Sequence, residues 1–213
     1  MARVFVTGVN RGIGAALMAE AKARGHTVAG TTRDGRDGTV PLRLDDPATI
    51  AGQLADIGPV DILINNAGVI GPDRQSPLDM DFGGFAATLA VNTLAPLAVA
   101  QALLPSLRAG QGARILTVSS QMAFMGYAKS DRIAYRASKT AVNKVMQGLA
   151  TDLAPEGIAC VLVDPGWVQT DMGGTGAPVT PEAVAQGILD LADRLTLADT
   201  GRFFRFTGEE RPF

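Results

Sequence analysis

The chain has 213 residues, of which 46% are hydrophobic and 19% are charged, and its 19 basic and 21 acidic residues leave a formal net charge of −2. This balance excludes a nucleic-acid-binding surface built on bulk positive charge, and the hydrophobic content excludes a disordered chain. One cysteine, Cys160, and one histidine, His26, are too few for an internal disulfide or a zinc site. We therefore expect no metal and a reducing, cytoplasmic compartment.

In the first half of the chain, apolar runs of strand length alternate with longer stretches of helical period. A glycine-rich turn at 8–14 ends the first strand, Gly25 ends the first helix, and Pro47 begins the next one. The elements expected there, in chain order, are a strand at 3–7, a helix at 13–24, strands at 27–32 and 40–44, a helix at 47–57 and a strand at 60–65.

The second half begins with a long uncharged stretch at 82–107, which passes a crude length test for a membrane span. Asn92, Thr93 and Gln101 favour instead a central helix buried on several sides by its own protein, so we expect no membrane segment. The expected elements are a helix at 78–108 bent at Pro96, a strand at 114–119, a helix at 131–154, a strand at 158–164, a helix starting at Thr180 and a strand at 202–206.

This alternation predicts an α/β fold with a single Rossmann-type, doubly wound parallel sheet of about seven strands and helices on both faces. No internal repeat, low-complexity segment, charge block or linker divides the chain. We therefore expect residues 1–213 to form a single dinucleotide-binding and catalytic domain, with a short substrate loop at about 171–180.

The turn Thr7–Gly14 follows a predicted strand and opens a helix. Glycines there let the backbone approach a pyrophosphate, which the free N–H groups of the helix N-terminus stabilise. The alternative is an ordinary glycine-rich turn. The turn has no Gly-Lys-Ser/Thr ending, so a P-loop hydrolase is not supported.

Tyr135 and Lys139 are four residues apart, so on a helix they share one face. A fixed cation near a tyrosine favours the phenolate and lowers the pKa of the phenol, which suits general acid–base work on an oxygen atom. The alternative is an amphipathic helix with a solvated lysine.

Three further polar patterns stand at strand ends or inside the uncharged helix. Ser119 and Ser120 end one predicted strand, Asn65–Gly68 ends another, and Asn92 lies within the helix. Ligands bind at the carboxyl edge of an open parallel sheet, although such residues also serve only as caps or as partners for neighbouring polar groups.

Together these patterns resemble the short-chain dehydrogenase/reductase family over nearly the whole chain, and most of all its small carbonyl-reductase and C-factor-like branch. The resemblance implies hydride transfer between a nicotinamide and a carbonyl or alcohol substrate, with Tyr135 as general acid/base. Lys139 would hold the nicotinamide ribose and bias Tyr135, Ser120 would bind the substrate oxygen, and Asn92 would hold a water linking Lys139 to solvent. Ser120 is chosen over Ser119 because the family's serine is normally the second of such a pair.

The resemblance also implies a set of dinucleotide contacts. These are Gly8, Asn10, Arg11, Gly12, Ile13, Gly14, Thr32, Arg33, Asp45, Asn66, Ala67, Gly68, Tyr135, Lys139, Pro165, Gly166, Val168 and Thr170. Arg33 and Arg11 can pair with a 2′-phosphate, whereas Asp34 would contact an NAD ribose if the second strand ends two residues later. We therefore favour NADP(H), with NAD(H) as the alternative.

The resemblance implies that the substrate is a small carbonyl or alcohol compound. It also implies that the protein forms a homodimer or homotetramer through the helices at 78–108 and 131–154. Met122, Tyr127, Trp167 and Met172 could line an apolar substrate pocket or simply fill the core. The second function class is a dinucleotide-binding regulatory or signalling protein with a reductase-like fold.

Overall fold

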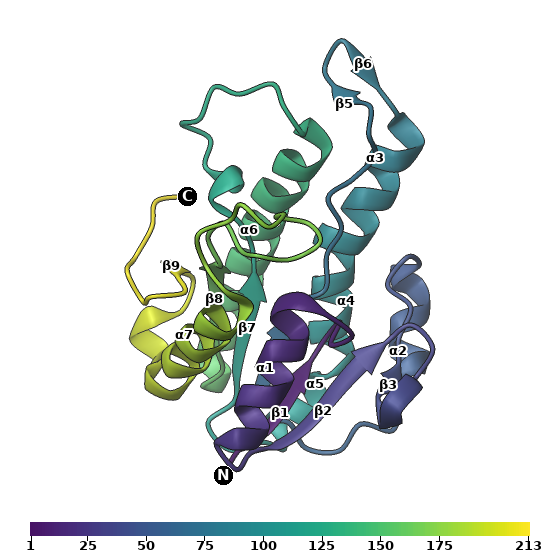
Figure 1. Cartoon of the computed structure of the whole chain (residues 1–213). Helices are drawn as coiled ribbons and strands as arrows, with labels where there is room; N and C mark the ends of the chain where they lie inside the picture. The colour runs from purple at the N-terminus through teal and green to yellow at the C-terminus, as the bar shows by residue number, and fades with distance from the viewer.

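A seven-stranded parallel sheet runs through the centre of the computed structural model, which describes all residues from 1 to 213 (Figure 1). Its strands are β1 (Arg3–Val6), β2 (Thr27–Thr32), β3 (Val40–Pro41), β4 (Ile62–Asn65), β7 (Arg114–Val118), β8 (Ala159–Asp164) and β9 (Phe203–Arg205). The spatial order is β3-β2-β1-β4-β7-β8-β9, so the direction of winding reverses between β1 and β4. Ligands bind at such a reversal, because the turns after the two strands open side by side.

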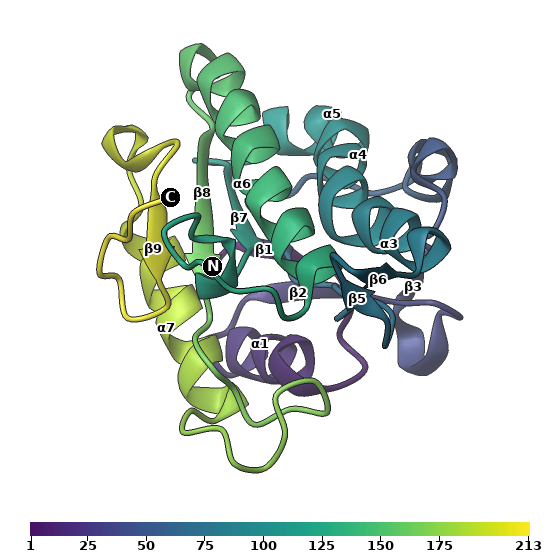
Figure 2. The same ribbon diagram turned by 90° about the horizontal axis from the view of Figure 1, so that it is seen from above.

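Helices cover both faces of the sheet (Figure 2). On one face lie α1 (Gly12–Ala23) and α7 (Pro181–Arg194), and on the other lie α2 (Ile50–Gln53), α4 (Ala95–Ala102), α5 (Leu104–Arg108) and α6 (Ile133–Leu153). Successive strand residues point to opposite faces of the sheet, and each face has its own hydrophobic core. Val6 lies in the core that contains Leu17 of α1, while Phe5 lies in the core that contains Val99 of α4. The predicted fold class is confirmed.

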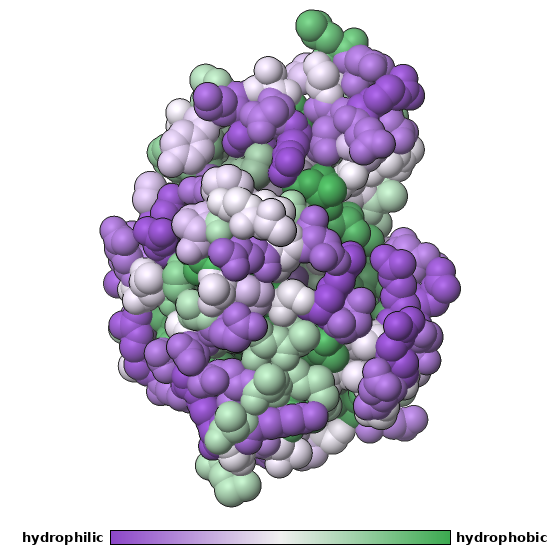
Figure 3. All heavy atoms as spheres, viewed as in Figure 1, coloured by the Kyte–Doolittle hydropathy of each residue, from purple (hydrophilic) through white to green (hydrophobic).

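The predicted single helix at 78–108 is wrong at its start. Residues 75–80 form a two-stranded hairpin of β5 (Gln75–Ser76) and β6 (Asp79–Met80), and helix α3 (Phe82–Leu89) begins only after Asp81. The Asp81 carboxylate caps that helix by accepting the Gly84 N–H at 2.9 Å. The hairpin projects from the molecule, and its tip forms a hydrophobic area at the top of Figure 3.

The rest of that segment is interrupted as well as bent. A π-helical turn at Ala90–Leu94 separates α3 from α4, and α4 ends at Ala102, with Leu103 between it and α5. Pro96 lacks the N–H that would bond the Asn92 carbonyl four residues earlier, so the helix widens just before it. The predicted bend at Pro96 is therefore a change of helical winding that begins in the preceding turn.

Two predicted elements are shorter than expected. The strand at 40–44 ends at Pro41, and the helix at 47–57 consists of a 3-10 turn at Pro47–Thr49 followed by α2. The last bond between β3 and β2 runs from the Leu42 N–H to the Thr32 carbonyl at 2.8 Å, and the next N–H, of Arg43, donates to the Gln53 side chain instead at 2.7 Å.

The segment Phe82–Ala102 is long and apolar enough to cross a membrane by length and composition, with a mean hydropathy of 1.5 and 33% of its residues buried. Its inward side carries the buried Asn92 and Thr93 and packs against α6. Its other side exposes Phe82 and Leu94. The part that forms α4 also packs against α2 and β4, so the expectation that this segment is buried on several sides holds for α4, whereas α3 is covered mainly by α6.

Candidate active site

Two of the predicted motifs lie against each other at the carboxyl ends of β1 and β4. The Thr7 hydroxyl accepts the N–H groups of Asn66 and Ala67 at 3.0 and 3.1 Å. In return the Asn66 amide donates to the carbonyls of Thr7 and Gly8 at 3.0 and 3.1 Å. The two motifs therefore form one rigid wall at the reversal point of the sheet.

The glycines of this wall allow close backbone contacts that any side chain would prevent. Gly8 and Gly12 have φ values of +72° and +54°, which favour glycine. A Cβ on Gly8 would lie 2.9 Å from the Ala67 Cβ, and one on Gly14 would lie 2.0 Å from the Gly8 carbonyl oxygen. Bare backbone therefore meets the N-terminus of α1, a geometry that fits a dinucleotide pyrophosphate.

Past the end of β2, Arg33 is exposed and forms no ion pair, whereas Asp34 is neutralised. Arg36 holds the Asp34 carboxylate at 2.7 Å and keeps its pKa far below its usual range, and Thr32 also donates to it. Arg11, expected to share a 2′-phosphate with Arg33, forms an ion pair with Asp171 of the substrate loop.

Asp45, one of the predicted dinucleotide contacts, is exposed and pairs with Arg43 at 3.1 Å. Asn10 is exposed and Ile13 is half-buried beside the glycine-rich turn. Thr170 touches the same turn, because a Cβ on Gly12 would lie 3.0 Å from its methyl carbon. The turn Pro165–Gly166 follows β8, and Val168 bridges to Val179 within the substrate loop.

The four residues proposed for catalysis come from three elements and none is more than 9% exposed. Asn92 lies in the π-helical turn, Ser120 follows β7, and Tyr135 and Lys139 lie on the first turns of α6. The Lys139 ammonium donates to the Val118 carbonyl at 2.8 Å and lies 5.8 Å from the centre of the Tyr135 ring. Ser119 turns away and donates to Asn143, which leaves Ser120 as the serine beside the phenol.

Asn92 is fully buried, and both its amide nitrogen and its amide oxygen are hydrogen-bonded. It donates to the Val69 carbonyl at 2.8 Å and to the Ser138 hydroxyl at 3.0 Å, and it accepts the Val69 N–H at 2.8 Å. A Cβ on Gly68 would lie 3.2 Å from Asn92 Oδ1 and 3.6 Å from Lys139 Nζ. The loop after β4, Asn92 and Lys139 therefore meet at one point.

Burial dominates the electrostatics of this cluster. It raises the pKa of Tyr135 to about 12, although the Ser120 hydroxyl lowers it, and it lowers the pKa of Lys139 to about 8. The expectation that Lys139 gives Tyr135 a lowered pKa is wrong for this structure, because desolvation of the phenolate is the larger effect. At neutral pH the phenol keeps its proton, as a proton donor must.

Three of the four residues that could line an apolar substrate pocket or fill the core do not fill the core. Tyr127, Trp167 and Met172 are exposed, while Met122 is half-buried. The Trp167 indole donates to the Gly173 carbonyl at 2.7 Å and so ties the Pro165–Gly166 turn to the substrate loop. A hollow of about 370 Å³ lies next to the start of α6, lined by Ile70, Gln75 and Arg132 among others.

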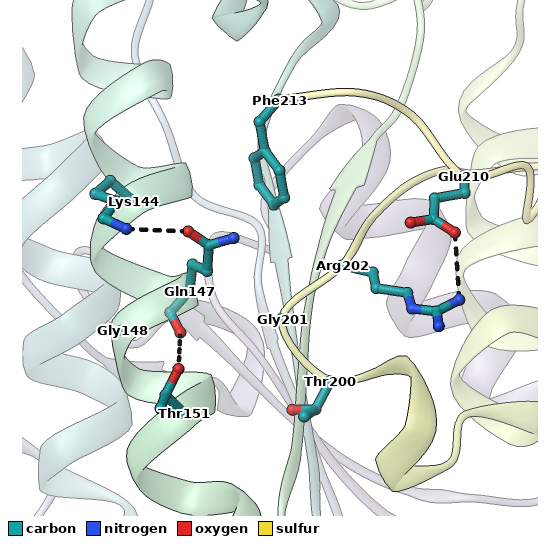
Figure 4. Close-up of a pocket in the computed structure, with 9 residues that line it drawn as sticks. All are labelled: Lys144, Gln147, Gly148, Thr151, Thr200, Gly201, Arg202, Glu210 and Phe213. Carbon is teal, nitrogen blue, oxygen red and sulfur yellow. Dashed lines mark hydrogen bonds and ion pairs between the residues drawn. The ribbon is translucent and has the colours of Figure 1, made fainter.

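A second hollow, of about 460 Å³, lies at the opposite end of α6 (Figure 4). It is lined by Lys144, Gln147 and Thr151 of α6 and by Thr200 and Arg202, which precede β9. None of the four proposed catalytic residues borders it, because they gather at the carboxyl ends of the strands.

Sequence reasoning missed three residues that shape the site. Gln75 accepts the Tyr135 N–H at 3.2 Å, Arg36 neutralises Asp34, and Asp164 accepts the N–H groups of Gln121 and Gly166. Asp164 stands directly before Pro165 and could have been noticed there. Gln75 lies in a segment with no local signal.

Comparison with known proteins gives a consistent result. A family model described as short chain dehydrogenase matches residues 45–178. The protein "C-signal" of Myxococcus xanthus is 44% identical over 158 residues, which cover 73% of this chain and 94% of that protein. The 1-hydroxy-2-glutathionyl-2-methyl-3-butene dehydrogenase of a Rhodococcus species is 30% identical over 220 residues, which cover 95% of this chain and 96% of that protein. The NADPH-bound carbonyl reductase from chicken fatty liver superposes with a TM-score of 0.90 at 29% identity, covering 100% and 99%.

Proposed function

Since the chain belongs to the short-chain dehydrogenase family of NAD(P)-dependent oxidoreductases, we propose that it reduces small carbonyl compounds with NADPH. The observation that carries the proposal is a buried tyrosine, Tyr135, that holds its proton at neutral pH between a serine hydroxyl and a lysine ammonium. Its proposed proton acceptor is the carbonyl oxygen of the substrate.

A dinucleotide held by the glycine-rich turn Thr7–Gly14 and the Asn65–Gly68 turn would supply the hydride for the carbonyl carbon. As negative charge develops on the carbonyl oxygen, Tyr135 transfers its phenolic proton to that oxygen, and the product is an alcohol. Ser120 donates a hydrogen bond to the same oxygen and orients it. The Lys139 ammonium stabilises the phenolate that remains, because the two groups are buried together and poorly screened.

Asn92 acts on the proposed catalytic residues indirectly, through the backbone beside Lys139. Its side chain fixes both backbone groups of Val69 and so holds the Gly68 backbone beside Lys139. Its Oδ1 lies on the Lys139 side of Gly68, where a water linking Lys139 to solvent would be held. We assign it this positioning role.

NADPH is preferred over NADH in this proposal because of the residues after β2. Arg33 is free to pair with a 2′-phosphate, and the one carboxylate that could accept an NAD ribose, Asp34, is neutralised by Arg36. The chicken carbonyl reductase that superposes on this chain is an NADPH-bound structure.

We propose that the substrate is a small apolar aldehyde or ketone. We also propose that the protein acts as a homodimer in the cytoplasm. The open rim of Tyr127, Trp167 and Met172 supports the substrate class. The exposed side of Phe82–Ala102, with Phe82 and Leu94, supports the dimer, and the buried free thiol of Cys160 suits a reducing compartment. A regulatory or signalling role alone is not favoured, because binding a dinucleotide needs no buried tyrosine–lysine pair.

The test is NADPH oxidation against a panel of aldehydes, ketones and quinones, with wild type and Tyr135→Phe side by side. We expect turnover with apolar carbonyl compounds, and a loss of at least about 100-fold in the variant, since general acid catalysis contributes that much. NADPH affinity should stay within a few-fold, because only the transferable proton is removed. Activity of the variant close to wild type would refute the role of Tyr135, and no turnover on any compound would favour the signalling role.

A further inference from the structure

Asp164 is a buried carboxylate beside the proposed active site for which the mechanism above has no use. It is the last residue of β8 and is 1% exposed. One of its oxygens accepts two backbone N–H groups, from Gln121 at 3.0 Å and from Gly166 at 2.9 Å. Gln121 follows Ser120, and Gly166 belongs to the turn proposed to contact the dinucleotide. A single carboxylate oxygen therefore joins the loop that carries Ser120 to that turn.

The other oxygen of Asp164 is buried and has no hydrogen bond of good geometry. Its neighbour is the guanidinium of Arg211, whose Nε lies 3.3 Å away and which is itself mostly buried. Arg205 stands in register with Asp164 on the adjacent strand, but its guanidinium stacks over the Phe206 ring. Arg211 is therefore the cation that balances the Asp164 charge, since an isolated buried carboxylate is costly.

Arg211 reaches this position because the segment after β9 folds back on the sheet. Its own N–H donates to the Phe203 carbonyl at 2.7 Å, and Phe213 stacks on Phe203 with ring centres 5.8 Å apart. Before it, Glu210 pairs with Arg202 at 3.2 Å at the border of the hollow in Figure 4. The last residues of the chain are thus held in place on both sides of Arg211.

Few charges act on the Tyr135 phenol. They are Asp164 at the end of β8 and Arg132 before α6. Lys139 on α6, with a pKa of about 8, is neutral at the pH where the phenol titrates, and the neighbouring groups from β7 and β5, Ser120 and Gln75, carry no charge. The Asp164 carboxylate raises the pKa of Tyr135, and Arg132 lowers it. Whatever neutralises Asp164 therefore makes the phenolate easier to form.

We propose that Arg211 is a positioning residue that acts through Asp164: it neutralises the carboxylate, sets the acid–base behaviour of Tyr135 and keeps the Ser120 loop joined to the Pro165–Gly166 turn. The inference rests on the proposed function for its meaning in catalysis. It places the end of the chain, far from Tyr135 in sequence, in control of how readily the phenol gives up its proton.

The ionisation of Tyr135 can be observed directly, because the chain has two tyrosines and Tyr127→Phe makes Tyr135 the only one. The test records phenolate absorbance just after stopped-flow pH jumps, before alkaline unfolding begins. In this background we expect Arg211→Gln to raise the apparent pKa of the phenol by about 0.5–1 unit and Asp164→Asn to lower it by a similar amount. Asp164→Asn keeps an oxygen for the two N–H groups, so it changes charge and leaves the link in place.

The double variant decides whether Arg211 works through Asp164. With Asp164→Asn already present, adding Arg211→Gln should shift the phenol no further. Arg211→Lys should restore the wild-type value, and Arg202→Gln, which breaks the neighbouring ion pair with Glu210, should leave it unchanged. A shift from Arg211→Gln that persists in the Asp164→Asn background, an equal shift from Arg202→Gln, or no shift in a folded Arg211→Gln protein would overturn the proposal.

Turnover gives a second reading. The pH profile of alcohol oxidation, which needs the phenolate, should move in the same directions as the absorbance titration. Absence of any turnover in wild type would refute the proposed function alone, since the titration would still decide the role of Arg211.

Discussion

Arg33 and Asp34 are adjacent but differ in their contacts: Arg33 forms no ion pair, while the Asp34 carboxylate is paired with Arg36. We predict that Arg33→Ala weakens NADPH binding roughly 10- to 150-fold, because a charge-assisted contact of about 1.5–3 kcal/mol is lost. NADH affinity should hardly change, since NADH lacks the 2′-phosphate. Titrating both dinucleotides checks this, with Arg74→Ala, which breaks an ion pair in the distant hairpin, as control. Equal losses for the two dinucleotides would point to Asp34 as the contact instead.

Lys139 should reduce the stability of the fold while serving the reaction. Its pKa is about 8 instead of 10.5, so between these values the unfolded chain binds more protons and the free energy of unfolding rises with pH. Below pH 8 the whole penalty is present, and it is roughly 3 kcal/mol for such a shift.

We therefore predict that Lys139→Met abolishes turnover yet increases the free energy of unfolding at pH 7, by up to about 3 kcal/mol less the cost of leaving the Val118 carbonyl unpaired. Urea unfolding at pH 7 and pH 10 measures the effect. The advantage over wild type should shrink at pH 10, where the native lysine is mostly neutral. A variant less stable than wild type at pH 7 would contradict the burial argument.

At the scale of elements, two helical glycines should respond in opposite ways to the same substitution. Gly14 in α1 faces the Gly8 carbonyl, and an added Cβ would meet it at 2.0 Å, whereas a Cβ at Gly148 in α6 meets nothing within 4 Å. We predict that Gly148→Ala stabilises the protein by about 0.5–1 kcal/mol, the usual gain for alanine in a helix.

Gly14→Ala should instead destabilise the protein and weaken dinucleotide binding, because the β1 turn must move. Thermal unfolding and a dinucleotide titration of both variants decide this. Wild-type affinity in Gly14→Ala would show that the close approach of α1 to the turn is not needed.

The regular elements were predictable because their signals are local. The apolar run at Ile62–Asn65 and the helical period of α6 specify β4 and α6 from neighbours within a few residues. The hairpin of β5 and β6 was missed because a distant partner holds it, whereas Pro96 predicted a bend but not the π-helical turn before it, which distant contacts also hold. Gln75 is fixed by Tyr135, and Asn92 by Val69 and Ser138.

The site divides in the same way. Tyr135 and Lys139 share a helix face that spacing alone reveals, and the glycine-rich turn is visible after its strand. The neutralisation of Asp34 and the contact of Asp164 with Arg211 depend on tertiary geometry, and so does the dominance of burial over the lysine charge at Tyr135. Roles for individual residues, and the single domain, remain predictions, the latter supported by one continuous sheet.

For the whole molecule, the exposed side of Phe82–Ala102 should decide the assembly. Leu94 is 49% exposed at its centre, and a carboxylate there would have to be desolvated in a dimer. We predict that Leu94→Glu sediments as a monomer while wild type sediments as a dimer. Leu78→Glu, at the 98% exposed tip of the hairpin, is the matched control and should remain dimeric. A dimeric Leu94→Glu would place the interface elsewhere.

The hydrogen bond from Trp167 to Gly173 gives the molecule its own optical reporter. Trp167 is the only tryptophan of the chain, and it stands between the Pro165–Gly166 turn and the substrate loop. A reduced nicotinamide held near it absorbs at the wavelengths that an indole emits, so energy transfer would dim the emission as the dinucleotide binds. Movement of the loop would instead break the hydrogen bond of the indole and shift the wavelength of its emission maximum. Occupancy and loop movement can thus be followed separately in the unlabelled protein.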